Sequence, residues 1–262
     1  MGEVPKSHPR YASLMSRKKL TDAAAAGMLA DSALIAHGRG EAFDYLLGEE
    51  TCEPAKEAIF QTAGCLQNAE KCVISVNGNT VALAGSQLIA LAALVKCPIE
   101  VNIYYRTPER MEALLLALQK HREEAAELYP EIVNEISNVE ILGGNPDGRI
   151  PNLDGPRANC HTDGILSADT ILVPLEDGDR CEALVAMGKT VCVIDLNPLS
   201  RTAQTATVTI VDELTRCVPI LLEILKEGKG ELNEHNTSLH PDDWDNEKNL
   251  QDVVDVMLRR FE

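Results

Sequence analysis

Three short apolar runs rich in β-branched residues lie close together between residues 170 and 212, at 170–175, 190–196 and 206–211. None of the runs alternates with polar residues, which is typical of strands buried on both faces of a parallel sheet. An acidic turn and one helix's length of mixed residues separate the first two runs. This pattern predicts an open α/β sheet, and it constrains the fold more than any other part of the chain.

Polar and glycine residues follow two of these runs directly, in the segments EDGDR (176–180) and DLNPLSRT (195–202). In open α/β sheets, ligands bind at the carboxyl ends of the strands. The Asp, Asn, Ser, Arg and Thr side chains found there suit the ribose and phosphates of a nucleotide. We therefore expect this edge of the sheet to be the functional one.

The rest of the chain extends the α/β pattern on both sides of this stretch. Further strands are predicted at residues 71–77, 99–105 and 138–142, and helices at 8–29, 53–69, 80–96, 108–136, 212–226 and 249–261. Asp212 is expected to cap its helix, and Pro219 to bend or shorten it. Residues 143–167 are rich in Gly, Pro, Asn and Asp, which predicts a long irregular binding loop or lid.

These elements predict a doubly wound α/β fold, with a mostly parallel sheet, helices on both faces and a helical N-terminal segment. Residues 1–228 form a single α/β domain in this interpretation. Residues 229–262 supply an acidic exposed connector and a C-terminal helix that packs on the same domain.

Composition excludes several classes of function. The net charge of −17 argues against a nucleic-acid partner, which would need a basic surface. No apolar run reaches the roughly 20 residues that span a bilayer, and the N-terminal segment lacks the apolar core of a secretory signal. We expect a cytoplasmic protein. The cysteines and histidines lack metal-site spacing, so no metal centre is predicted.

The same acidity makes arginines in turns informative, because a phosphorylated ligand needs a locally positive site. In Gly38-Arg39-Gly40 the arginine is flanked by glycines and follows a brief apolar segment, which predicts a turn. Glycines on both sides would let the backbone approach an anion. The alternative is an ordinary turn whose arginine caps part of the structure. Arg17 cannot be distinguished from its basic neighbours by spacing alone.

A second candidate turn, Asn77-Gly78-Asn79-Thr80, joins a buried strand to an Ala- and Leu-rich helix. Such a strand–turn–helix unit can hold phosphate. The chain has neither Gly-x-Gly-x-x-Gly nor a P-loop. Residue patterns alone therefore predict an anion-binding α/β domain, compatible with ATP use at a site of another type.

Four segments together carry a resemblance to a known family: IAHGRGEAFDYL (35–46), VISVNGNT (73–80), VPLEDGDR (173–180) and IDLNPLSRT (194–202). With the opening PKSHPRY (5–11), they resemble archaeal-type phosphopantothenate synthetase over most of the chain, up to about residue 226. Two segments depart from the family pattern: 119–137 is longer and 143–163 matches poorly. These departures affect the expected lid and dimer contacts more than the expected nucleotide site.

The resemblance implies a Rossmann-like homodimer that acts in coenzyme A biosynthesis. The implied reaction condenses (R)-4-phosphopantoate with β-alanine, using ATP and giving 4′-phosphopantothenate, AMP and pyrophosphate through an acyl-adenylate. Mg²⁺ is expected with the ATP. Apolar helical faces such as Leu114 to Leu118 suggest where a second copy would pack.

The resemblance also implies which residues contact ATP: Arg17, Arg39, Asp195, Leu196, Asn197, Arg201, Thr202, Glu213 and Leu214. Chemistry suggests His37, Asn77 and Asn79 for the acid substrate. The catalytic candidates are Arg39, Asp177, Asp179 and Arg180, with the two aspartates placed to hold Mg²⁺ or the amine. Alternatively, the acidic pair only caps the following helix.

Two other functions remain open on sequence grounds. One is an ATP-dependent acid–amine ligase with a different substrate, which would form AMP without preferring 4-phosphopantoate. The other is a non-catalytic nucleotide-binding regulator. A regulator would keep the arginines that face phosphate but would need no second pocket for an acid and an amine.

Overall fold

A six-stranded parallel sheet forms the centre of the protein in the computed structural model, which describes residues 4–175, 178–228 and 240–260. The strand order is β3-β2-β1-β6-β7-β8, and every neighbouring pair is parallel. The strands are β1 (Cys72–Val76), β2 (Ile99–Val101), β3 (Ile141–Leu142), β6 (Thr170–Pro174), β7 (Thr190–Ile194) and β8 (Val208–Ile210). The predicted Rossmann-like α/β fold is confirmed.

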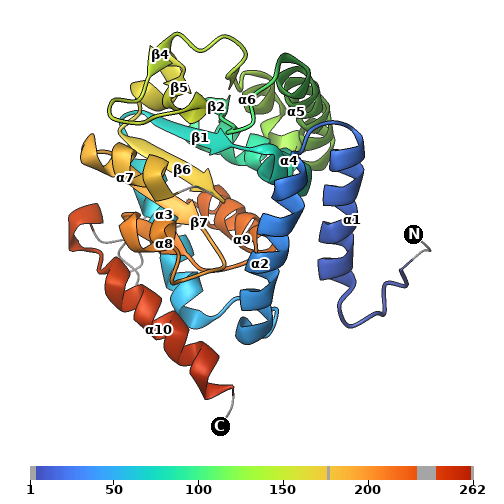
Figure 1. Cartoon of the computed structure of the whole chain (residues 1–262), viewed down its shortest axis with the longest axis vertical. Coiled ribbons are helices and arrows are strands. Elements are labelled where there is room, and N and C mark those ends of the chain that lie inside the picture. Colours follow the sequence, from blue (N-terminus) through green and yellow to red (C-terminus); the bar gives the residue numbers. More distant parts are fainter. Residues whose placement is uncertain (1–3, 176–177, 229–239, 261–262) are drawn as a thin grey trace.

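Helices cover both faces of this sheet (Figure 1). The helices are α1 (Tyr11–Ala25), α2 (Asp31–Leu47), α3 (Glu53–Asn68), α4 (Gly78–Val95), α5 (Pro108–Leu128), α6 (Val133–Ser137), α7 (Gly178–Ala186), α8 (Arg201–Thr205), α9 (Leu214–Lys226) and α10 (Asn246–Arg259). Helices α3, α4, α5 and α9 share one hydrophobic core with the sheet, and α7 lies in a second core on the opposite face. Helix α10 packs against α3, α8 and β8.

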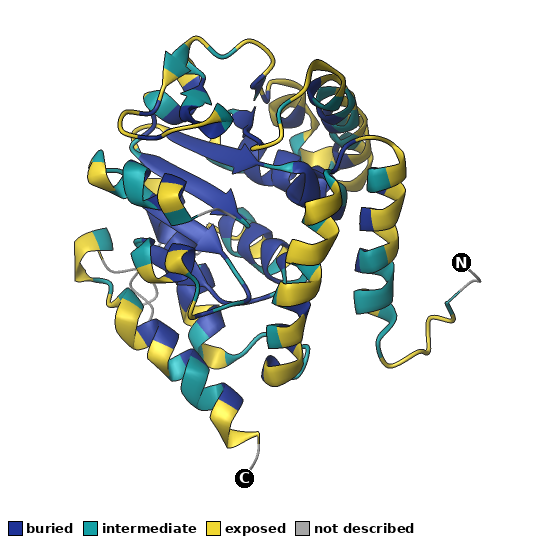
Figure 2. Cartoon of the chain, viewed as in Figure 1, coloured by how far each residue is buried: buried dark blue, intermediate teal, exposed yellow. Residues whose placement is uncertain are grey.

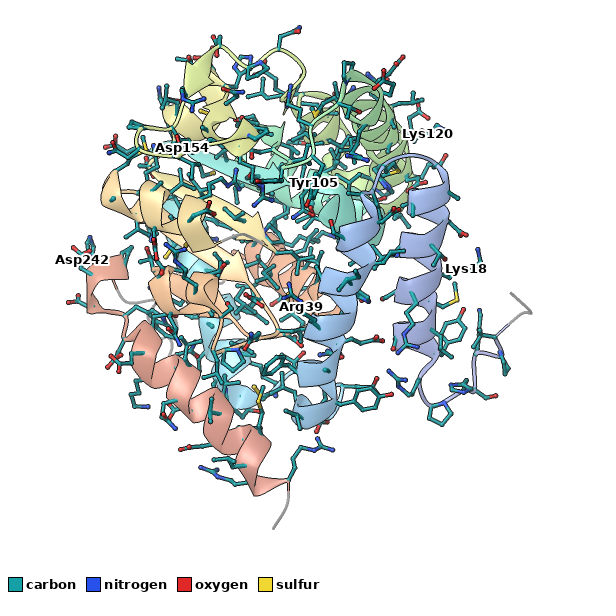
Figure 3. The ribbon with its side chains drawn as sticks, viewed as in Figure 1. Lys18, Arg39, Tyr105, Lys120, Asp154 and Asp242 are labelled. Atoms are coloured by element: carbon teal, nitrogen blue, oxygen red, sulfur yellow. The ribbon has the colours of Figure 1, made fainter. Side chains whose placement is uncertain are left out.

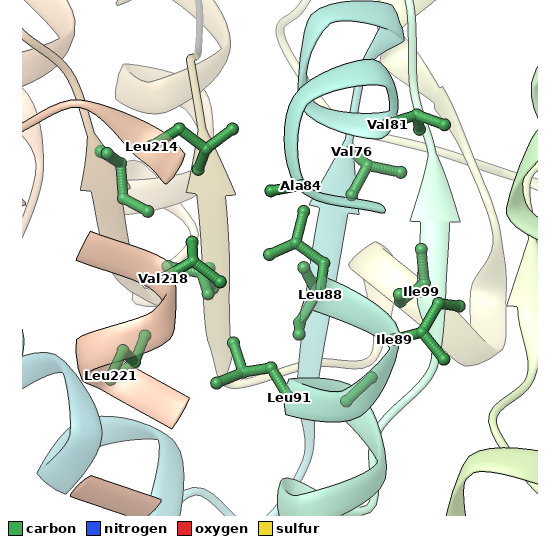
Figure 4. Close-up of a cluster of buried hydrophobic side chains, with 14 of the residues drawn as sticks. Val76, Val81, Ala84, Leu88, Ile89, Leu91, Ile99, Leu214, Val218 and Leu221 are labelled. Carbon is green, nitrogen blue, oxygen red and sulfur yellow. The ribbon is translucent and has the colours of Figure 1, made fainter. Parts of the chain in front are cut away.

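Helix α4 is the central helix of the larger core. Leu88, Ile89 and Leu91 point from it toward the sheet and toward Val218 and Leu221 of α9 (Figure 4). Its length and composition alone would allow it to cross a membrane, but 72% of that span is buried within the fold. Figure 2 shows the same dark, buried band through the sheet and its covering helices. Helix α4 is therefore the core helix of this domain.

Several predicted boundaries are wrong by a few residues. Helix α1 is shorter than predicted, and β2 ends at Val101 rather than at residue 105. The predicted continuous helix over 108–136 breaks after Leu128, because a residue before proline, here Tyr129, disfavours helical backbone. Helix α9 is capped by Glu213 rather than by Asp212, and it continues through Pro219 without being shortened.

Residues 143–167 are folded rather than irregular. They contain the antiparallel pair β4 (Gly148–Arg149) and β5 (Asn159–Cys160), the 3₁₀ turn Pro156–Ala158 and the π-type turn Thr162–Leu166. The buried carboxylate of Glu100, on β2, accepts hydrogen bonds from the backbone N–H groups of His161 and Ile165, each at 2.8 Å. These bonds fix the segment on the face of the sheet.

Candidate active site

A cavity of about 690 Å³ lies between the carboxyl ends of the strands and helix α2. It extends from the end of β7 to the loop after β2, so it spans the middle of the sheet. In Figure 3, the labelled Arg39 on α2 and Tyr105 on the loop after β2 both lie beside these strand ends. The predicted functional edge is thus the edge at which the cavity opens.

Many of the predicted site residues line this cavity together. They are His37, Arg39, Asn77, Asn79, Asp195, Leu196, Asn197, Arg201 and Thr202. They come from α2, from the turn between β1 and α4, and from the loop after β7 with the start of α8. The structure therefore brings together residues from all four sequence segments singled out by motif, the fourth through Leu175 and Gly178.

Gly38-Arg39-Gly40 is not a turn, which corrects the prediction. These residues lie within α2, which is helical from Asp31 to Leu47. A β-carbon added at Gly40 would lie 3.6 Å from Cδ1 of Leu196, so α2 packs closely on the loop after β7. Arg39 makes no hydrogen bond or ion pair with any residue that the structure describes. Its guanidinium lines the cavity with its donors available to a ligand.

The loop after β7 is held in shape by Asp195. Its carboxylate accepts hydrogen bonds from Asn197 N–H (2.9 Å) and from Ser200 Oγ (2.5 Å). Burial raises the pKa of Asp195, although these two bonds and the charge of Arg39 act in the opposite direction. Arg39 and Asp195 both line this cavity, and the positive charge of Arg39 favours the ionised form of Asp195.

The turn between β1 and α4 is a capping box. Asn77 Oδ1 accepts from Thr80 N–H (3.1 Å), and Thr80 Oγ1 accepts from Asn77 N–H (2.6 Å). The amide nitrogen of Asn77 donates to Leu175 O at 2.8 Å. Leu175 directly follows β6 and has left-handed backbone (φ 59°), a strained conformation for leucine. The Asn77 side chain thus fixes two strand ends relative to each other.

The glycine of this turn serves packing rather than an open phosphate loop. A β-carbon at Gly78 would lie 2.5 Å from Leu29 Cδ2 and 2.9 Å from Met28 O. Only glycine therefore lets α4 begin against the segment that joins α1 and α2.

Three residues that line the cavity each carry a buried side-chain atom without a hydrogen-bond partner: His37 Nε2, Asn79 Oδ1 and Arg110 Nε. Buried polar atoms are nearly always paired, so three such residues around one cavity indicate a site for a polar ligand. Asn79 Nδ2 donates to Ala33 O (3.1 Å), which leaves its oxygen as the available acceptor. Burial lowers the pKa of His37, so its imidazole is neutral near pH 7.

Positive charge dominates the cavity although the chain carries −17. Among the described lining residues there are four arginines, Arg39, Arg110, Arg157 and Arg201, and one carboxylate, Asp195. Arg201 is also bound to Glu182 at the surface. This local reversal of charge favours an anionic ligand.

Five predicted site residues do not line the cavity: Arg17, Asp179, Arg180, Glu213 and Leu214. Arg17 Nε lies 2.9 and 3.0 Å from the two carboxylate oxygens of Glu41. Arg180 is fully buried and donates to Ser75 Oγ (3.0 Å). Leu214 is buried in the core, and the Glu213 carboxylate accepts from Thr215 N–H (2.6 Å) at the start of α9.

The acidic pair is only partly described. Asp179 is exposed in the first turn of α7, where its carboxylate accepts from the N–H of Arg180 (2.9 Å). Asp177 lies outside the described residues. Within the described parts of the chain, no group of three or more His, Cys, Asp or Glu side chains is arranged to hold a metal ion.

Sequence reasoning missed the lining residues Tyr104, Tyr105, Arg110 and Arg157. The first three follow β2, which ends at Val101 rather than at the predicted residue 105. With the correct end of β2, they would have been predicted as site residues, because ligands bind at the carboxyl ends of the strands. Arg157 lies in the 143–167 segment. The only sequence signal for it was an arginine in a loop of an acidic protein.

Comparisons with known proteins show which family the sequence resembles. The model of the phosphopantothenate/pantothenate synthetase family matches residues 54–260. The chain is 46% identical to the 4-phosphopantoate–β-alanine ligase of Thermococcus kodakarensis, over 97% of this chain and 92% of the relative. It is 47% identical to the ligase of the same name from Methanospirillum hungatei, over 82% of each chain. The corresponding values for Methanosarcina mazei are 42%, 97% and 94%. The chain therefore belongs to the phosphopantothenate/pantothenate synthetase family.

Proposed function

We propose that this protein is a ligase that condenses 4-phosphopantoate with β-alanine in coenzyme A biosynthesis, using ATP and releasing AMP and pyrophosphate. The names of its relatives support the two organic substrates. The observation that carries the proposal is the cavity, which joins four arginines to unpartnered polar atoms in a strongly acidic chain.

The proposed chemistry has two steps, and both involve the carboxyl group of the acid substrate. The carboxylate of 4-phosphopantoate attacks the α-phosphorus of ATP and pyrophosphate leaves, which gives an acyl-adenylate. The amine of β-alanine then attacks the acyl carbon, AMP leaves with the bonding electron pair, and the amine loses a proton. Both steps transfer charge onto phosphate oxygens, which positively charged donors stabilise.

The geometry suggests how the cavity would serve these steps. Arg39, Asn197 and Thr202 would bind ATP at the β7 end, close to Asp195. Asn79 Oδ1 and His37 Nε2 lie on the wall near the middle of the sheet and would contact the acid or the amine. Apolar side chains of α2, including Ala33, Ala36 and Phe43, would help to exclude water from the acyl-adenylate.

Mg²⁺ would enter as the counter-ion of the triphosphate. Asp195 is the described carboxylate on the cavity wall, and both of its oxygens already accept hydrogen bonds. We therefore expect Mg²⁺ to be held mainly by phosphate oxygens, with the Asp177 and Asp179 pair as the remaining candidate ligands.

A homodimer in the cytoplasm remains part of the proposal, but its interface must be revised. Leu114 and Leu118 are fully buried within the chain, so they cannot contact a second copy. A better surface is the outer face of α2, where Leu34, Ile35, Tyr45 and Leu46 are exposed. Because Leu34 and Ile35 are eleven residues, or three helical turns, before Tyr45 and Leu46, these side chains share one face.

Product analysis tests the reaction. Purified protein should form AMP from ATP in amounts equal to 4′-phosphopantothenate when 4-phosphopantoate and β-alanine are both present. ADP and inorganic phosphate as products would indicate an acyl-phosphate route and refute the adenylate mechanism. Equal turnover with other acids would favour a ligase of different specificity. A regulator would bind ATP without turnover.

A further inference from the structure

We propose that Arg110 and Arg157 form an oxyanion subsite at the β2 end of the cavity and bind the phosphate of the acid substrate there. This inference rests on the proposed ligase function and adds the residues that would select a phosphorylated acid. Neither arginine lies in the four segments that carried the family resemblance.

The order of the strands separates this subsite from the place proposed for ATP. Along the cavity edge, β1 and β6 lie between β2 and β7. Neighbouring strands are about 4.8 Å apart, so the two ends of the cavity are roughly 14 Å apart. A small acid whose phosphate sits at the β2 end can therefore extend its carboxylate toward the α-phosphate of a nucleotide bound at the β7 end.

Arg110 is positioned by the first turn of α5. Its backbone N–H donates to the N-cap Thr107 Oγ1 (3.2 Å), and its Nη1 donates to Tyr105 O. The buried Nε of the same guanidinium has no protein partner, and Arg110 is one of the residues that line the cavity. One edge of this side chain is thus fixed by the protein, while its remaining donors can bond to an oxyanion.

Arg157 approaches the same end of the cavity from the 143–167 segment. It is only 8% exposed and lines the cavity. Asn102, just after β2, donates from Nδ2 to the backbone oxygens of Arg157 (3.1 Å) and Asn159 (3.0 Å). The backbone that carries Arg157 is therefore tied to the end of β2. Tyr104 and Tyr105 follow in the loop after that strand, and Arg110 lies in the first turn of α5.

The charge of this end fits a phosphate monoester better than a carboxylate. A phosphate monoester carries −1.5 to −2 charge near neutral pH and offers three acceptor oxygens, whereas a carboxylate carries one charge, so a phosphate gains more from guanidinium donors. The carboxylate known on the cavity wall, Asp195, lies at the β7 end within the described part of the site. The rings of Tyr104 and Tyr105, 5.0 Å apart and edge to face, line the cavity beside these arginines.

The test compares two acids in the first half-reaction. Exchange of labelled pyrophosphate into ATP is measured without β-alanine, with 4-phosphopantoate or with unphosphorylated pantoate. The variants are Arg110→Gln, Arg110→Lys and Arg157→Lys. The control is Arg122→Gln, because Arg122 lies on the same helix, bonds to Val139 O (3.2 Å) and is not part of the cavity wall.

We expect Arg110→Gln to lower kcat/KM for 4-phosphopantoate by about 30-fold or more while leaving the value for pantoate unchanged. Arg110→Lys and Arg157→Lys should show smaller losses of the same selectivity, because they keep the charge but lose the planar fork. Arg122→Gln should behave as wild type. Equal losses for both acids, together with a lowered Tm, would show a structural role and overturn the proposal.

A second outcome would assign the subsite to the carboxylate of β-alanine instead. In that case the exchange reaction would be normal in every variant and the KM for β-alanine would rise in the full reaction, which overturns the proposal. Failure of the ligase function itself is distinguishable, because wild type would then show no exchange with either acid. Calorimetric titration of 4-phosphopantoate into wild type and Arg110→Gln would still test the subsite: loss of binding in the variant supports it, and equal or absent binding overturns it.

Discussion

At the scale of single residues, Arg39 shows how the structure separates a binding role from a structural one. The sequence left open whether this arginine caps part of the fold. In the described structure its guanidinium bonds to no protein group, and Arg39 lines the cavity together with Asp195. No capping contact of Arg39 is present among the described residues, and its role in binding phosphate stays a prediction.

We expect Arg39→Ala to weaken ATP binding or adenylation by about 2–4 kcal/mol, because an incoming triphosphate loses a charged hydrogen-bond partner. Arg39→Lys should recover only part of this loss, since lysine keeps the charge but not the bidentate geometry. A steady-state ATP titration and a melting curve for each variant would measure both effects. A clear drop in Tm with near-normal kinetics would contradict this account.

Glu100 provides a pH-dependent prediction at the same scale. Burial raises the pKa of Glu100, although hydrogen bonds from Ile165 and His161 and the charge of Arg180 act to lower it. A carboxyl group with a raised folded-state pKa stabilises the fold most below its unfolded pKa of about 4.3, and it loses that contribution as the pH rises through the folded value.

The difference in Tm between wild type and Glu100→Gln should therefore shrink as the pH rises from about 4 to about 7. The variant should be less stable throughout, because a glutamine oxygen cannot replace both acceptors and its NH₂ group would face a backbone N–H. Thermal melts across this pH range would measure the trend. A difference that widens with pH would show that the pKa of Glu100 is depressed in the fold.

At the scale of secondary structure elements, the buried strands were the easiest to predict and α2 the hardest. Unbroken apolar runs identified β1, β6 and β7 nearly to the residue, since burial on both faces leaves a strong local signal. Gly38 and Gly40 suggested a turn within α2, because each glycine lowers the stability of a helix by about 1 kcal/mol relative to alanine. The packing of α2 and the ion pair from its Asp44 to Arg216 of α9 (2.6 Å) stabilise the helix in spite of these glycines. Both depend on residues distant in sequence, so local sequence patterns could not predict them.

The start of α4 yields a prediction that separates packing from phosphate binding. Gly78→Ala places a methyl group against Leu29 and the backbone of Met28, and overpacking of this kind costs about 1–3 kcal/mol. We expect a lower Tm, partly restored by Leu29→Ala in the same chain, with little change in the KM for ATP. Normal stability with a raised KM would instead restore the view of this turn as a phosphate loop.

At the scale of the whole molecule, the sequence located the cavity edge but only part of its wall. Residues directly after β1 and β7 were found because the carboxyl ends of parallel strands meet at one edge. Arg157 was missed because it reaches the cavity only when residues 143–167 fold back onto β2 through Glu100 and Asn102. Such contacts depend on the complete fold rather than on a local motif.

The proposed dimer gives a prediction at this scale. Ile35 is 69% exposed on the outer face of α2, so Ile35→Asp should convert a dimer into a monomer in light scattering at micromolar concentration. Leu258→Asp is the matched control, because Leu258 is similarly exposed (61%) but belongs to α10 rather than to α2. A wild-type monomer would refute the dimer, and a dimeric Ile35→Asp variant would move the interface elsewhere.

The most direct test of the central claim is exchange of labelled pyrophosphate into ATP, measured with and without 4-phosphopantoate and in the absence of β-alanine. If the cavity forms an acyl-adenylate, exchange should require 4-phosphopantoate and fall by about 30- to 1000-fold in Arg39→Ala, the kinetic equivalent of 2–4 kcal/mol. Exchange that needs no acid, or no exchange in an enzyme that still makes 4′-phosphopantothenate with release of ADP, would contradict the account.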